Sequence, residues 1–123
     1  GYVFGATNFW TYIKKIKPYL AKVKKLGKSY YKDALGEIIG HGIYSLKYPA
    51  HLHIDINAPF RGNGNGSRMI STLTDHMKKN NGVKSIMLIV GTSNVRGIKF
   101  YKKNGFKVIC SLKNTGTVMA KEL

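Results

Sequence analysis

Three glycines alternate with single residues in the segment RGNGNGS (61–67). The preceding HLHIDI (51–56) alternates as a strand does, and SRMISTLTDHMKK (67–79) carries an apolar stripe with helical spacing. A glycine loop between a strand and a helix can bind a phosphate, because its backbone N–H groups and the helix N-terminus both attract anions. The segment therefore predicts a phosphate site, although a plain strand-to-helix turn fits the same residues.

Two well-known phosphate-binding motifs do not match this loop. A Walker loop needs Gly-Lys followed by Ser or Thr, whereas Gly66 is followed here by Ser67 and Arg68. A Rossmann fingerprint needs G-x-G-x-x-G with an acidic residue about 20 positions later, and this chain has G-x-G-x-G with no acid near that offset before Glu122.

Three ionisable side chains share one face of the strand 51–56. Because side chains alternate along a strand, His51, His53 and Asp55 point to one side, and the apolar residues between them point to the core. This face could be a wall of an active site that carries a general base, or only an exposed polar surface. A metal site is disfavoured, because no third ligand stands at a recognisable spacing.

Composition limits the class of protein. The 123 residues suit a single domain, and no apolar run approaches the length of a membrane span. No secretion leader is visible, so we expect a cytoplasmic protein, with the single Cys110 as a small buried core residue. With 21 basic and 5 acidic residues the net charge is +16, which attracts polyanions. No nucleic-acid-binding motif is present, so we expect no specific nucleic-acid partner.

The N-terminal half supplies a strand and a helix. Residues 1–7 resemble a short strand, and 9–26 form an amphipathic helix with Asn8 as its N-cap and a kink or break at Pro18. The lysine-rich face of this helix is more typical of a solvated surface than of a membrane or partner contact. Glycines interrupt 27–47, which predicts a loop with one helical turn at 33–39 and with His41 in an exposed turn.

The C-terminal half alternates strands and a helix. Residues 83–91 form a buried strand, and Thr92, Ser93 and Asn94 can cap a helix that Gly105 ends. A closing hairpin follows, with strands over 107–113 and 117–123 and a turn at 114–116.

This succession of segments resembles the GCN5-related N-acetyltransferase (GNAT) superfamily. The family pattern Arg/Gln-x-x-Gly-x-Gly/Ala is matched by Arg61, Gly64 and Gly66, and the family's second block is matched over 94–106, NVRGIKFYKKNGF. The two blocks lie about 30 residues apart, with a helix and a strand between them. Within the superfamily, GYVFGA and YPAHLHIDI resemble bacterial acetyltransferases related to the C-terminal acetyltransferase-like domain of O-GlcNAcase.

The resemblance implies one GNAT domain over residues 1–123, with an α+β (three-layer α/β) fold and a mixed, mostly antiparallel twisted sheet flanked by helices. Relative to the family, the opening strand and helices are missing, so we expect an N-terminally truncated domain. Asn65 replaces the usual aliphatic anchor, which predicts looser local packing. The glycine loop is intact, unlike that of the O-GlcNAcase domain, and this favours cofactor binding.

The resemblance also implies acetyl transfer from acetyl-CoA to a primary amine of a small molecule or peptide. The pantetheine arm would pair with backbone near Ile56 and Asn57, where this strand splays from 86–90. Asp55, or else His53, would be the general base and Tyr101 the general acid, while Asn94 would bind the cofactor, orient a water or only cap its helix. The pyrophosphate would rest on the backbone of the loop residues Arg61, Gly62, Asn63, Gly64, Asn65, Gly66 and Ser67.

The rival interpretation is a noncatalytic module that binds acetyl-CoA or a protein partner. The missing N-terminal elements and the lysine-rich helix favour this module, whereas the intact glycine loop and Tyr101 oppose it. An exposed sheet edge would also permit a homodimer.

Overall fold

The computed structural model describes residues 1–113 and 116–123. Five strands form the sheet in this part of the chain: β1 (Tyr2–Ala6), β2 (Ala50–Asp55), β3 (Ser85–Val90), β4 (Lys107–Ser111) and β5 (Thr117–Glu122). The helices are α1 (Phe9–Leu26), α2 (Lys28–Tyr44), α3 (Asn65–Asn81) and α4 (Val95–Lys103), with a short 3-10 helix, η1 (Ala58–Phe60).

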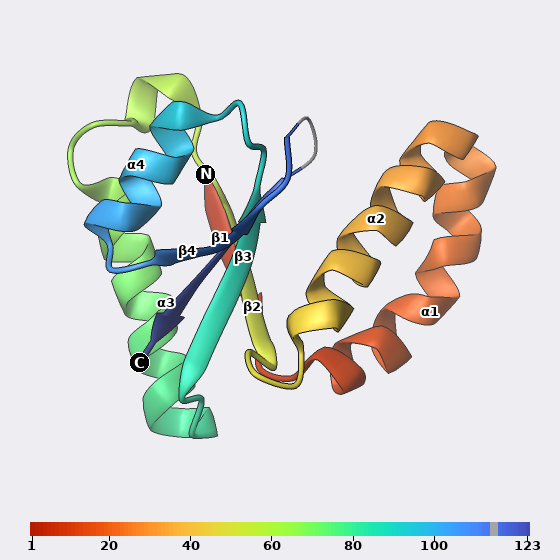
Figure 1. Cartoon of the computed structure of the whole chain (residues 1–123), viewed down its shortest axis with the longest axis horizontal. Coiled ribbons are helices and arrows are strands. Elements are labelled where there is room, and N and C mark those ends of the chain that lie inside the picture. Colours follow the sequence, from red (N-terminus) through yellow and green to blue (C-terminus); the bar gives the residue numbers. More distant parts are fainter. Residues whose placement is uncertain (114–115) are drawn as a thin grey trace.

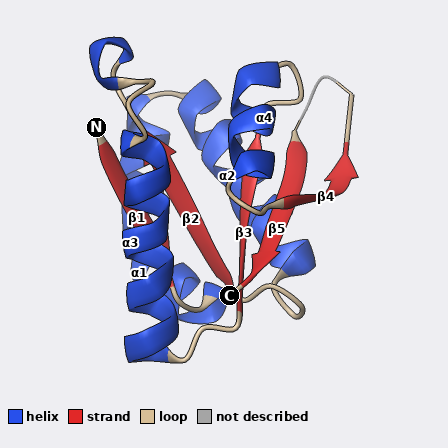
Figure 2. Ribbon diagram, turned by 90° about the vertical axis from the view of Figure 1, so that its left-hand side faces the viewer, coloured by secondary structure: helices blue, strands red, loops and turns tan. Residues whose placement is uncertain are grey.

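The strands follow the order β1-β2-β3-β5-β4. Only β2 and β3 run parallel, and the three other pairs are antiparallel. Helices α3 and α4 cover one face of the sheet, and the hairpin of α1 and α2 lies on the opposite side (Figures 1 and 2). The predicted three-layer α+β fold with a mixed, mostly antiparallel sheet is confirmed.

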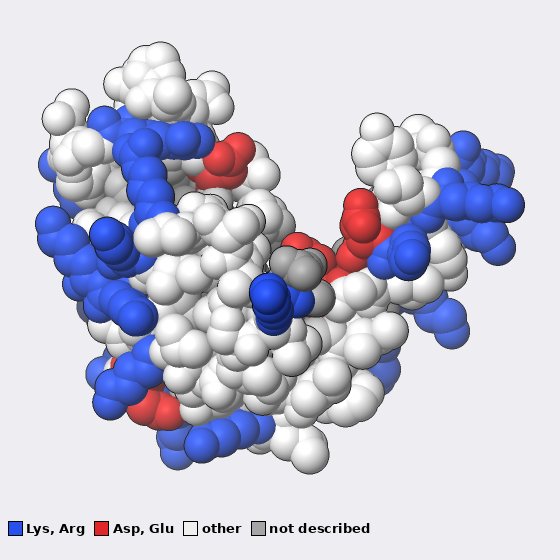
Figure 3. Space-filling model, turned by 45° about the horizontal axis from the view of Figure 1, so that its top comes forward, with Lys and Arg blue, Asp and Glu red and all other residues white. Residues whose placement is uncertain are grey.

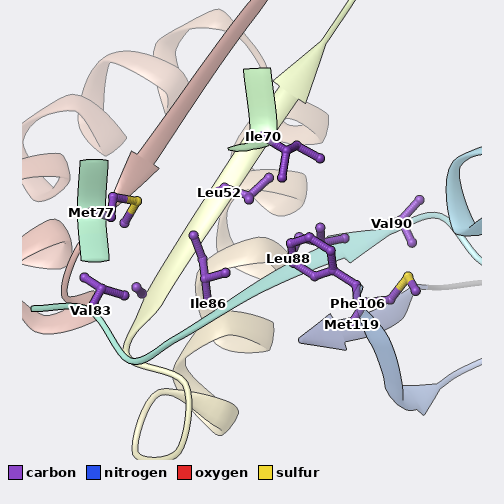
Figure 4. Close-up of a cluster of buried hydrophobic side chains, with 10 residues drawn as sticks. Leu52, Ile70, Met77, Val83, Ile86, Leu88, Val90, Phe106 and Met119 are labelled. Atoms are coloured by element: carbon purple, nitrogen blue, oxygen red, sulfur yellow. The ribbon is translucent and has the colours of Figure 1, made fainter. Parts of the chain in front are cut away.

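The alternation of strand β3 divides the core between the two faces of the sheet. Ile86, Leu88 and Val90 join a buried cluster with Ile70 and Met77 of α3, drawn in Figure 4. The intervening residues belong to the other face, where Met87 is fully buried in a smaller cluster that Tyr44 of α2 partly covers. A strand that is covered on both faces has a nearly continuous apolar sequence, as SIMLIV of β3 does.

Strands β2 and β3 pair over a short distance and then separate. Their parallel register consists of Ala50 with Ile86 and His51 with Met87. Strand β2 nevertheless continues to Asp55 and β3 to Val90, so the carboxyl halves of both strands lack each other as partners. The splay predicted near Ile56 is therefore present.

The prediction of a loop over 27–47 is wrong. Helix α2 is continuous from Lys28 to Tyr44, glycines included. Two of these glycines lie where the helix is closely packed: a Cβ on Gly40 would lie 2.7 Å from Ile89 Cδ1, and one on Gly42 would lie 3.1 Å from the Phe9 ring. Glycine weakens a helix by about 1 kcal/mol relative to alanine, but here it permits close contact with the sheet and with α1.

His41 is consequently not in an exposed turn. It belongs to α2 and is buried, with its ring centroid 4.4 Å from that of His51 on β2. Helix α1 matches its predicted bounds, and the Asn8 side chain accepts hydrogen bonds from the backbone of Trp10 and Thr11. The helix is continuous through Pro18, so the proline does not divide it, and its course bends in Figure 1.

The C-terminal elements follow the prediction closely. Asn94 caps α4, and the closing strands β4 and β5 form an antiparallel pair. The predicted turn at 114–116 lies largely outside the described residues. Cys110 is only partly buried at the edge of the smaller cluster, because β4 is an edge strand that exposes much of its length.

Candidate functional site

A cleft of about 240 Å³ opens where β2 separates from β3, on the side of α3 and α4. The end of β2, the glycine loop and the first turns of α4 form its walls. Its lining residues are Ile54, Asp55, Ile56, Arg61, Gly62, Gly66, Asn94, Arg96, Gly97, Phe100 and Tyr101.

The N-terminus of α3 is built to attract an anion beside this cleft. Gly64 is the N-cap residue, its φ of 75° is left-handed, and no side chain caps the helix. The first intrahelical bond at this end runs from the Arg68 N–H to the Gly64 carbonyl, at 3.0 Å. The N–H groups of the first turn therefore lack intrahelical acceptors, and the helix dipole adds positive potential there.

Gly66 brings α3 against α4. A Cβ at this position would lie 2.8 Å from the Phe100 ring and 3.2 Å from Ile56 Cδ1. By contrast, a Cβ on Gly64 would meet no atom within 4 Å. Gly66 is thus required for packing, whereas Gly64 provides a left-handed turn with open space in front of it.

Polar side chains tie the glycine loop to the end of β2. Arg61 Nε donates to the Ile56 carbonyl at 2.5 Å, and an Nη of Arg61 lies 4.0 Å from the Asp55 carboxylate. The Asn65 amide donates to the Phe60 carbonyl at 2.9 Å and accepts from Arg68. Where an aliphatic anchor was expected, Asn65 therefore holds the loop by hydrogen bonds.

Helix α4 contributes Tyr101 and its cap Asn94. Tyr101 is half-buried, its ring lies 5.8 Å from Phe106 in an edge contact, and burial raises the pKa of its hydroxyl. The phenol therefore remains protonated at neutral pH and can donate a proton. The Asn94 side chain accepts a hydrogen bond from the Gly97 N–H at 2.8 Å, so its role as a helix cap is confirmed.

The three ionisable residues of β2 have separate environments. His51 is buried and its neighbour His53 is exposed, with the His53 ring stacked on Phe4 at 5.5 Å. Asp55 is exposed and lines the cleft. Only Asp55 of this face therefore reaches the cleft.

The cleft brings together about half of the predicted site. Asp55, Ile56, Arg61, Gly62, Gly66, Asn94 and Tyr101 line it, whereas His53, Asn57, Asn63, Gly64, Asn65 and Ser67 do not. Four lining residues were not predicted: Ile54, Arg96, Gly97 and Phe100. Their positions in the sequence could have indicated them, because Ile54 shares the predicted core face of β2 and the other three belong to the segment 94–106.

Two further properties hold over the described ranges, 1–113 and 116–123. No group of three or more His, Cys, Asp or Glu residues there could hold a metal ion. None of the helices there combines the length and apolar character that a membrane crossing requires.

Comparison with protein families gives one match over most of the chain. The model described as the acetyltransferase (GNAT) family matches residues 8–106. No curated protein sequence matches the chain significantly.

Solved structures share the fold. The crystal structure of SsHAT has a TM-score of 0.77 at 20% identity, covering 98% of this chain and 65% of SsHAT. A GCN5-related N-acetyltransferase from Kribbella flavida has a TM-score of 0.54 at 24% identity, covering 60% of this chain and 50% of that protein. A GNAT-family acetyltransferase from Streptococcus pneumoniae has a TM-score of 0.52 at 21% identity, covering 60% of this chain and 49% of that protein. The chain thus spans about two-thirds of the length of SsHAT and half that of the others.

Proposed function

The chain belongs to the GNAT family of acetyltransferases, and we propose that it transfers an acetyl group from acetyl-CoA to a primary amine. The observation that carries this proposal is the cleft beside the end of β2, beyond the point where β2 stops pairing with β3, with an uncapped helix N-terminus next to it.

The pyrophosphate of acetyl-CoA would bind at the start of α3. Of the predicted loop residues, Arg61 already donates its backbone N–H to the Ala58 carbonyl at 3.2 Å, so the N–H groups from Gly62 to Ser67 would donate to the pyrophosphate oxygens. The helix dipole would favour the negative charge. The open space in front of Gly64 supports close approach of a phosphate to the backbone. Asn94 and Arg96, which line the cleft from α4, would contact the remaining polar parts of the molecule.

The pantetheine arm would run beside the end of β2, where β3 is no longer its partner. The Ile56 carbonyl already accepts from Arg61 Nε, which fixes the backbone on which the arm would pair at Ile56 and Asn57. A backbone N–H in this stretch would stabilise the thioester oxygen as negative charge develops on it. This arrangement would present the acetyl carbon to the gap between the two strands.

Acetyl-CoA supplies an activated acetyl group, and side chains of this chain would move the protons. The amine must lose a proton to attack, and Asp55 in the cleft wall is the first candidate base, with His53 the second. Tyr101 would donate its proton to the departing thiolate, since a phenol is protonated at neutral pH and burial raises the pKa of this one further.

The noncatalytic alternative is a module that binds acetyl-CoA without transferring its acetyl group. Acetyl-CoA binding without acetylation of any amine would favour this module. We also propose that the chain is related to the O-GlcNAcase-like acetyltransferases and that it is located in the cytoplasm.

Gly64→Val tests the cofactor site. The branched side chain would obstruct the loop, so we expect acetyl-CoA affinity to be lost. The matched control is Gly82→Val at the C-cap of the same helix, where φ is 63° and a Cβ would also meet no atom within 4 Å. Both variants carry similar backbone strain, but only the first changes the proposed site.

Isothermal titration calorimetry with acetyl-CoA and circular dichroism would compare the two variants with the unmodified chain. Loss of binding in both variants would show that backbone strain alone explains the effect. A folded Gly64→Val variant with unchanged affinity would exclude the glycine loop as the binding site.

A further inference from the structure

A second cavity, of about 50 Å³, lies on the opposite side of the sheet from the cleft, beneath the α1–α2 hairpin. Consecutive residues of β2 border the two cavities: Leu52 and His53 line this one, and Ile54 and Asp55 line the cleft. Its lining also includes Phe4, Tyr12, Glu37, Ile38, His41, His51 and Ile89. The cavity therefore lies at the gap between β2 and β3, across the sheet from the proposed acetyl-CoA site.

His41 lines this cavity, and one of its two ring nitrogens has no hydrogen-bond partner. Its Nδ1 lies 2.8 Å from the Glu37 carbonyl of its own helix, and a carbonyl can only accept, so Nδ1 carries the proton. Nε2 is then the acceptor, on the opposite edge of the ring, directed away from the α2 backbone. Among the described residues, this Nε2 is the one buried side-chain nitrogen or oxygen without a hydrogen-bond partner, in a side chain only 8% exposed.

The surroundings keep this nitrogen available as a base. Burial lowers the pKa of His41, and the pKa of His51, 4.4 Å away, is lowered by burial and by His41 to about 4. The charge of Glu37 raises the pKa of His41, and that of His53 lowers it. The remaining titratable group that lines the cavity is Tyr12 on α1. Both buried imidazoles are therefore neutral at pH 7.

Charge and size restrict what can enter. Glu37 is one of only 5 acidic residues in a chain of net charge +16, and its place in the cavity wall suits an ammonium group. Figure 3 shows acidic side chains beside the hollow between the helical hairpin and the rest of the molecule, with a few basic ones near them and most basic ones on the outer surfaces. One water needs at least about 10–15 Å³, so 50 Å³ admits the end of an unbranched alkylamine but no sugar ring.

We propose that this cavity receives the acceptor as an unbranched primary alkylamine, and that His41 Nε2 takes the proton from its nitrogen. This inference rests on the proposed acetyl transfer and names His41, in place of Asp55 or His53, as the base. The amine nitrogen bonds to the acetyl carbon as the C–S bond breaks. Only the neutral amine can attack, so the bound ammonium group first loses one proton to solvent. The proton that the nitrogen then loses as the amide forms passes to Nε2, and the leaving thiolate takes the proton of Tyr101. Proton exchange with solvent restores neutral His41 and Tyr101.

Binding of the amine can be measured without turnover. Titration of the ¹⁵N-labelled chain with n-butylamine, followed through the histidine side-chain nitrogens, should shift the His41 Nε2 resonance as the lone pair accepts a hydrogen bond. Cyclohexylmethylamine has the same CH₂NH₂ group on a ring and should leave it unchanged. An unshifted His41 resonance at saturating n-butylamine would overturn the proposal.

Kinetics with His41→Gln test the role of the base. We expect turnover to fall by about 10²- to 10⁴-fold, with loss of the acidic limb of the pH profile and unchanged acetyl-CoA affinity. His76→Gln on α3 is the matched control, because His76 is exposed and, within the part of the chain that the structure describes, hydrogen bonds only Asn80. Glu37→Gln should raise the KM for n-butylamine without changing acetyl-CoA affinity, and it provides a second variant should His41→Gln fail to fold.

The two proposals fail in different ways. If the unmodified chain does not bind acetyl-CoA, the proposed function fails. If His41→Gln folds, binds acetyl-CoA and keeps the full rate and pH profile, acetyl transfer stands and the role of His41 is overturned.

Discussion

Tyr101 combines a position in the cleft wall with a hydroxyl that burial keeps protonated. Tyr101→Phe preserves the ring and its contact with Phe106 but removes the proton donor. We expect turnover to fall by about 10²- to 10⁴-fold while acetyl-CoA affinity changes little, because the proton is needed mainly in the transition state. Steady-state kinetics and titration calorimetry would measure both quantities.

Tyr19→Phe is the control for this substitution, since Tyr19 lies on α1 and is 58% exposed. A fully active Tyr101→Phe variant would remove the tyrosine from the chemistry. Loss of acetyl-CoA binding together with activity would instead give Tyr101 a role in binding.

His51 makes stability depend on pH. Above pH 6.5 the residue is neutral in both the folded and the unfolded chain. Between pH 6.5 and about pH 4, His51 binds a proton in the unfolded chain but not in the folded chain. The free energy of unfolding should therefore fall as the pH drops from 6.5 to 4, by roughly 3 kcal/mol from this group. Urea denaturation at several pH values would measure this slope.

His51→Gln should flatten the slope, although His41, whose pKa is also lowered, will leave part of it. The exposed His76 provides the control, because His76→Gln should leave the slope as it is. Equal slopes in all three proteins would refute the assignment to His51.

At the level of single residues, the sequence predicts features that depend only on residues nearby in the chain. Asn94 was predicted as a cap because an amide before an apolar helix can accept from the first turn, and it does so. The contact between His41 and His51 had no such signal. It depends on how α2 lies across β2, and no spacing along the chain encodes that arrangement.

Among the elements, α2 shows where sequence patterns are insufficient. Its glycines lower helix propensity, so the segment was predicted as a loop. In the structure Gly40 faces Ile89 of β3, and tertiary contact decides the conformation. Helices α1 and α4, with side-chain caps and clear apolar stripes, were predicted correctly.

The glycines of α2 should therefore respond differently to alanine. Gly36 has no atom within 4 Å of a Cβ, so Gly36→Ala should stabilise the chain by about 0.5–1 kcal/mol through helix propensity alone. Gly40→Ala gains the same propensity but places a methyl group 2.7 Å from Ile89 Cδ1, which must move. We expect no net stabilisation there. Chemical denaturation would compare the two, and equal gains would show that α2 does not press on β3 at Gly40.

For the molecule as a whole, the pairing of the sheet determines where the site can be. Parallel pairing of β2 and β3 ends after two residue pairs, and the cleft and the smaller cavity lie on opposite sides of the resulting gap. The family resemblance predicted this splay. At the far edge of the described sheet, Tyr2 and Phe4 of β1 are half exposed, which keeps a homodimer through this edge as a prediction.

The net charge of +16 complicates any binding experiment, because it attracts every polyanion. Charge attraction between exposed groups is screened over about 8 Å at physiological ionic strength and over about 3 Å at 1 M. A shaped site keeps its backbone hydrogen bonds under the same conditions. We therefore expect heparin binding to disappear between 0.1 and roughly 0.5 M salt, while the Kd for acetyl-CoA rises only several-fold.

Gly64→Val separates the two contributions, because it alters the loop and leaves the net charge unchanged. At low salt this variant should bind heparin as the unmodified chain does and acetyl-CoA only weakly. At high salt it should bind neither ligand. If acetyl-CoA binding by the unmodified chain declined with salt as steeply as heparin binding, its affinity would come from the general positive field. The glycine loop and the splayed strands would then have no part in selecting the cofactor.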